Sequence, residues 1–135
     1  SSAKKNAVKA IHNNVMKYIA SEYTKCSIDD SDTIMMKGGT GGVACDEGNI
    51  VAGDMTAHLA DEDATPIEDK NPYSTADMAI VEGTGDSYVS GTITITPTSD
   101  SLITITTCFG NGKTEEPCTA TADPNFTLKN TVTVE

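Results

Sequence analysis

The last third of the chain alternates threonine with isoleucine, and this alternation constrains the fold more than any other feature. Two segments, residues 87–96 and 102–108, carry it. Period-two alternation is typical of a β-sheet with one buried face. It places four isoleucines on the same side of the two segments, namely Ile93, Ile95, Ile103 and Ile105.

The polar run between these segments, residues 97–101, contains Pro97 and Asp100 and predicts a turn. We therefore expect the two strands to form a hairpin. Residues 127–134 repeat the alternation and predict a further strand. Its inward residues are expected to be Leu128, Val132 and Val134.

The first part of the chain predicts a helix. Residues 3–25 contain neither proline nor glycine, and their apolar residues recur at spacings of three or four. Such spacing traces one stripe along a helix. Lys5 and Lys9 lie four apart and outside the stripe, so we expect them on an exposed face. The stripe consists of Val8, Ile11, Val15, Ile19 and Tyr23.

Residues 26–86 have a mixed pattern and predict a long connecting loop. Short apolar pieces at 33–36, 50–51 and 55–59 are expected to form brief strands or turns of helix. A connection of this length is usually functional or pinned by cross-links. We therefore predict a single α+β domain over residues 1–135, in which one N-terminal helix packs on an antiparallel sheet of about four strands at residues 87–135.

Four cysteines are expected to form two disulfides. Their spacing contains no C-x-x-C pair and gives no support for a zinc site. Three pairings are possible, and we favour the sequence neighbours, Cys26 with Cys45 and Cys108 with Cys118. Only 37% of the residues are hydrophobic and 4% aromatic, so the cross-links would offset a thin core.

The charge is unevenly distributed. Residues 1–25 hold five lysines and one acid, whereas the remaining residues hold four lysines and nineteen acids. This division suggests a surface that meets another copy of the chain. The overall net charge of −11 argues against binding of nucleic acid by this domain. No run approaches the ~20 apolar residues of a membrane-spanning helix.

No pattern predicts an enzyme, a cofactor or a metal site. His12 falls on the helix and His58 in the predicted loop, and neither sits in a recognisable triad. The glycine cluster 38–42 lacks the Lys-Ser/Thr ending of a phosphate loop and is interpreted as a turn. The acidic runs 29–32 and 61–63 lack EF-hand spacing and are interpreted as solvated loops. Asn125-Phe126-Thr127 matches a glycosylation sequon.

Three stretches together resemble one family. Residues 7–19 look like the exposed half of a long N-terminal helix, and Asn71-Pro72-Tyr73 is similar to an Asn-Pro-aromatic element that leads from a variable loop toward a sheet. Residues 91–95 and 103–108, with Cys118 after them, resemble a hairpin and a disulfide-bounded region. In this order the chain resembles the globular region of a bacterial type IV pilin.

The resemblance implies a structural subunit of an extracellular, cell-surface pilus. Copies of the chain would be each other's partners, with the pilus assembly machinery, and the precursor would sit in the bacterial inner membrane. Lys5, Lys9 and Lys17 would then contact the acidic part of a neighbouring subunit. Mature pilins begin with a methylated Phe and an apolar helix of about one membrane span. Residues 1–135 lack this segment, so we expect the sequence to start midway along that helix.

Two other interpretations stay open. A type II secretion pseudopilin resembles pilins and can bind calcium in its loops, although two disulfides and a threonine-rich hairpin favour a pilin. A free secreted binding or adhesin domain belongs to a different class. An upstream apolar stretch of ~25 residues with an early Glu would favour a pilin over the free domain.

Overall fold

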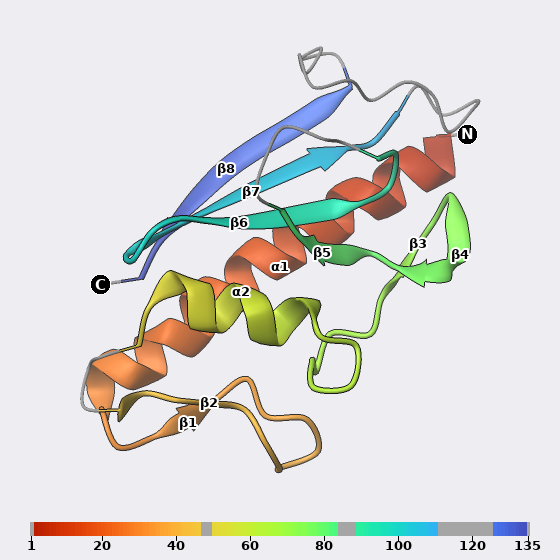
Figure 1. Ribbon diagram of the computed structural model, residues 1–135. Coiled ribbons are helices and arrows are strands. Elements are labelled where there is room, and N and C mark those ends of the chain that lie inside the picture. The colour runs from red at the N-terminus through yellow and green to blue at the C-terminus, as the bar shows by residue number, and fades with distance from the viewer. Residues whose placement is uncertain (1, 47–49, 84–88, 111–125, 135) are drawn as a thin grey trace.

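A computed structural model of the chain describes residues 2–46, 50–83, 89–110 and 126–134. Within these residues the protein has two layers, with helices α1 (Ser2–Ile28) and α2 (Ala52–Ala60) on one face of a four-stranded sheet (Figure 1). The sheet order is β5 (Ile80–Glu82), β6 (Ile93–Ser99), β7 (Leu102–Cys108) and β8 (Thr127–Thr133). Two small antiparallel pairs accompany it, β1 (Thr33–Ile34) with β2 (Val43–Ala44) and β3 (Lys70–Asn71) with β4 (Ser74–Met78). The α+β prediction is confirmed.

Helix α1 forms where the apolar stripe predicted it and is slightly longer than residues 3–25. Val8, Val15 and Ile19 are fully buried against the sheet, while Tyr23 is half-buried. The helix packs mainly on β7 and β8. Burial of this apolar stripe against the sheet stabilises the helix, whose exposed residues have little apolar character.

The hairpin of β6 and β7 confirms the Thr/Ile alternation. Ile95 pairs with Ile105, and all four isoleucines of the alternating set are fully buried on the face that the helices cover. The predicted turn is shorter than residues 97–101, because Pro97 stays in β6 opposite Ile103. A register shift follows between Pro97 and Ser99, where the missing N–H of proline is tolerated.

One strand of the sheet contradicts the antiparallel prediction. Strand β5 runs parallel to β6, with Ile80 opposite Ile93 and Glu82 opposite Ile95. It lies inside the segment 26–86 that the sequence assigns to loop. A two-residue hairpin joins antiparallel strands only, so the parallel sense of β5 and β6 needs a longer connection, and ten residues separate the two strands.

Helix α2 also lies inside the segment 26–86, where only a brief strand or a turn of helix is expected at residues 55–59. Its buried residues, Ala52, Met55, Thr56 and Leu59, follow the spacing of an amphipathic helix. The Asp54 carboxylate accepts a hydrogen bond from the Val51 N–H at 3.4 Å at its first turn. His58 therefore lies on a helix, and the expectation of a loop at this position is wrong.

Neither helix among the described residues has the length and apolar character that a membrane-spanning helix needs.

Candidate interaction surface

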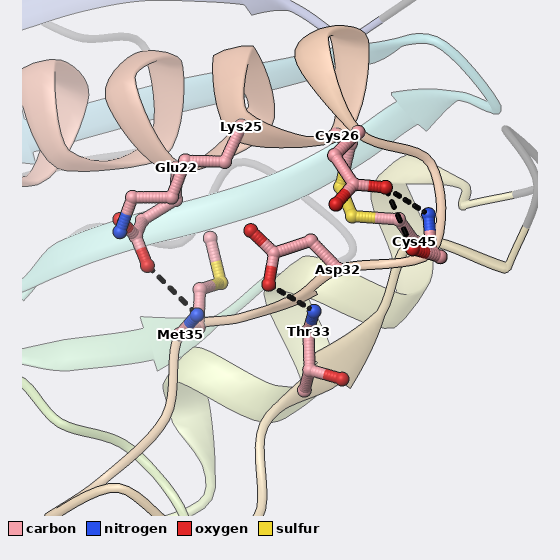
Figure 2. The surroundings of a disulfide bond; sticks show 9 residues. Glu22, Lys25, Cys26, Asp32, Thr33, Met35 and Cys45 are labelled. Atoms are coloured by element: carbon pink, nitrogen blue, oxygen red, sulfur yellow. Dashed lines mark hydrogen bonds and ion pairs between the residues drawn. A yellow bond between two sulfur atoms is a disulfide. The ribbon is translucent and has the colours of Figure 1, made fainter.

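The predicted disulfide between Cys26 and Cys45 is confirmed, with their Cα atoms 5.3 Å apart (Figure 2). Both cysteines are buried, Cys26 on the last turns of α1 and Cys45 directly after β2. The bond closes a loop over 19 positions and fixes the β1–β2 pair beside the helix. The backbone N–H of Cys45 adds a hydrogen bond to the Asp32 carbonyl at 2.9 Å.

A buried glutamate forms a second attachment of the same segment to α1. Glu22 lies one turn before Cys26, and its carboxylate accepts the Met35 N–H at 2.8 Å (Figure 2). It is also paired with Lys25. Burial opposes ionisation of Glu22, but the hydrogen bonds from Lys25, Met35 and Tyr18 outweigh it and lower the pKa of this carboxyl. Met35 adopts a left-handed φ of 57°, and this hydrogen bond satisfies its buried N–H.

Only one cysteine of the second predicted disulfide lies within the described residues. Cys108 is fully buried at the end of β7. Cys118 lies outside the described residues, so its pairing with Cys108 stays a prediction. Asn125 of the sequon also lies outside them.

The predicted interface lysines occupy different environments. Lys5 and Lys9 are half-buried, and the expectation that they lie on an exposed face is wrong. Their amines lie 5.8 and 4.3 Å from the centroid of the Phe109 ring, within range of cation–π attraction. Phe109 is itself buried, so the two stems cover apolar surface that would otherwise meet water. Lys17 is exposed.

The element Asn71-Pro72-Tyr73 connects the β3–β4 pair to the main sheet. Asn71 is buried, and its amide donates to the Ser90 carbonyl at 2.9 Å, while its oxygen accepts the Tyr73 N–H at 2.8 Å. The Tyr73 hydroxyl donates to the Phe109 carbonyl at 2.8 Å. Two aromatic residues that are distant in sequence thereby meet beside the first turns of α1.

We expect Gly91→Ala to destabilise the protein by about 1–3 kcal/mol. Gly91 has a φ of +81°, and a Cβ at this position would lie 2.0 Å from the Asn71 side-chain oxygen. Chemical denaturation compares this variant with Gly53→Ala, where a Cβ meets nothing within 4 Å. Equal stability of the Gly91 variant and the wild type would contradict this prediction, because it would show that the Asn71 side chain can make room for the added methyl group without cost.

A cleft of about 520 Å³ opens beside this element. Strand residues Met78, Ile80 and Val81 line it together with Val89, and two carboxylates, Glu62 and Asp77, are exposed at it. The Asp77 carboxylate accepts the Ser74 hydroxyl at 2.6 Å. Apolar walls with a few polar groups are typical of binding sites. The lining residues come from several elements, so no local pattern in the sequence indicates this cleft.

A buried histidine joins α1 to the sheet. His12 is fully buried, with Nδ1 2.7 Å from the Thr107 hydroxyl and Nε2 2.7 Å from the Asn130 side-chain oxygen. Burial lowers its pKa, although the Asn130 hydrogen bond acts in the opposite direction. Its spacing of four from Val8 was the available signal that it lies on the buried stripe.

The remaining candidates serve local structure. Lys37 and Thr40 form a tight bridge, and Gly38, Gly39, Gly41 and Gly42 have positive φ, so residues 38–42 form the expected turn between β1 and β2. Asp29 and Asp61 accept hydrogen bonds from Ser31 and from the Asp63 N–H. Across the described part of the chain, no cluster of three His, Cys, Asp or Glu side chains is placed to hold a metal ion.

Comparison of the chain with protein-family models, curated proteins and solved structures found no match.

Proposed function

We propose that this domain is the globular head of a structural subunit of a type IV pilus-like filament. The observation that carries the proposal is the order of its elements, with a long N-terminal helix laid on one face of a sheet whose last three strands are antiparallel. That order is the one implied by the resemblance in the sequence. An apolar helix upstream of these residues would polymerise the subunits and leave the heads outside.

The segment between helix and sheet supports the same function. It is rich in glycine and acidic residues, and the disulfide and the hydrogen bond from Met35 to Glu22 attach it to the end of α1. A covalently pinned surface loop suits an extracellular assembly, where disulfides persist. Helix α2 and the parallel β5 depart from the simplest form of the resemblance; β5 is the edge strand of the sheet, and α2 packs on β5 and β6.

The proposal predicts thin surface filaments that carry this domain. Antibodies raised against residues 1–135 and used in immunogold electron microscopy should label filaments on the cells that make the protein. The coding sequence upstream should contain ~25 apolar residues with an early Glu. Label found only on unpolymerised secreted protein would contradict the proposal. That result would instead support a free binding domain, which the cleft beside Asn71 favours.

A further inference from the structure

We infer that the cleft beside β4 and β5 receives lysine side chains from α1 of a second copy of this chain, with Lys17 as the principal contact. The inference deepens the proposed filament function and rests on it for its purpose. It assigns a defined surface on each copy to the contact between neighbouring heads.

The cleft is chemically suited to lysine. Val81 is 40% exposed and Val89 is 61% exposed, so two aliphatic side chains face solvent where the cleft opens. Glu62 and Asp77 supply negative charge, and none of the described residues that line the cleft is a lysine, arginine or histidine. A lysine carries an apolar four-carbon stem and a cationic end. Its stem can pack on the two valines while its amine reaches the two carboxylates.

The acidic surface continues beyond this cleft. A neighbouring hollow of about 370 Å³ shares Glu62 and Met78 with it and adds Asp63 and Glu68. Lys70 lines this second hollow, and Lys37 is paired with Glu68 at 2.7 Å. Carboxylates outnumber the cations that meet them, so the joined surface attracts a positively charged partner.

The outward face of α1 has the opposite character. The only acid of the helix, Glu22, is 7% exposed and paired with Lys25. Lys4 lies 5.5 Å from the centroid of the Tyr73 ring. Lys17 is exposed, and within the described residues it makes no ion pair or ring contact. It is therefore the lysine of α1 that is most available to another molecule.

The neighbours of Lys17 on the helix surface allow a close approach. Residues three and four positions away share its face. They are exposed, small and uncharged, namely Asn13, Asn14, Ala20 and Ser21. A cleft wall can therefore approach Lys17 without meeting a bulky or repelling side chain.

The contact can be located by zero-length cross-linking. Equal amounts of ¹⁴N- and ¹⁵N-labelled 135-residue chain are mixed at low ionic strength, treated with a carbodiimide and digested. We expect mixed-isotope peptides that join Lys17 to Glu62 or Asp77, with a several-fold lower yield at high salt. Mixed-isotope links that map only to other lysines, or no such links, would overturn the inference.

A charge swap gives the decisive comparison. Glu62→Lys and Lys17→Glu should each lower the yield of mixed-isotope links about three- to tenfold, and the double variant should restore it. The matched controls are Asp100→Lys and Lys129→Glu, which change exposed charges outside both hollows and should leave the yield unchanged. Equal losses in the controls, or no restoration in the double variant, would overturn the contact.

The outcome is separable from the filament proposal. Wild-type filaments without the Lys17 link would overturn this inference and leave the filament function standing. A Lys17 link in a protein that never forms filaments would support the contact and overturn the filament function. A link that forms only with a cationic peptide added from another protein would assign the cleft to a different partner and overturn the inference.

Discussion

Replacing Cys26 and Cys45 together with alanine is expected to lower the free energy of unfolding by about 3 kcal/mol. The bond spans 19 positions, and closing a loop of that length lowers the conformational entropy of the unfolded chain by an amount equivalent to about 3 kcal/mol. The loss is large for a domain whose core has few aromatic side chains. Denaturant-induced unfolding of the oxidised protein and the variant measures it.

Glu22→Gln is the control for this prediction. The amide keeps an oxygen that can accept the Met35 N–H, but it removes the charge that pairs with Lys25. We expect a loss of about 1 kcal/mol, smaller than that of the cysteine variant. Hydrogen exchange at Thr33 and Met35 should accelerate most in the cysteine variant. A total loss below about 1 kcal/mol for the cysteine pair would show that the segment is held without its bond.

Replacing His12 with leucine is expected to destabilise the protein by about 2–4 kcal/mol. The fully buried Thr107 hydroxyl would lose its partner, as would the Asn130 side-chain oxygen, and leucine differs in shape from the imidazole. Adding Thr107→Val removes one of the two orphaned groups, so the double variant should recover part of the loss. Thermal or chemical denaturation of the three proteins tests this coupling. An unchanged double variant would contradict a direct hydrogen bond.

The same residue should make stability depend on pH. The pKa of His12 is lowered in the folded protein by burial, so the unfolded chain binds a proton more readily. Stability should therefore be complete above about pH 6.5 and should fall as the pH drops from there toward the folded pKa. The decrease is at most ~1.4 kcal/mol per pH unit. It should be absent between pH 7 and pH 5.5 in His12→Leu, and an identical slope in both proteins would contradict the assignment.

Local patterns predicted the elements whose apolar residues recur regularly on one face. Ile93, Ile95 and the stripe through Val15 are buried as expected, because a period of two or of about 3.6 is set by the backbone itself. The pairing of Cys26 with Cys45 followed from sequence proximity. The α+β class followed from these features together.

Elements with short or mixed patterns were predicted only loosely or not at all. Helix α2 has nine residues and includes Gly53, so its periodicity is too brief to separate from a loop. Strand β5 has three residues and forms only because β6 and α2 lie beside it. Its parallel direction depends on the path of the chain between the two strands, which no local pattern specifies.

The sequence by itself determined the conformation and the apolar face of the long periodic segments, the N-terminal helix and the Thr/Ile strands, since those follow from spacing along the backbone. The tertiary structure decided how individual side chains are used. Lys5 and Lys9 look like solvent-exposed charges in the sequence, but both lie against Phe109, about a hundred positions away. His12 looks like a lone histidine until Thr107 and Asn130 approach its ring. Such contacts depend on long-range packing, and only the folded chain brings their partners together.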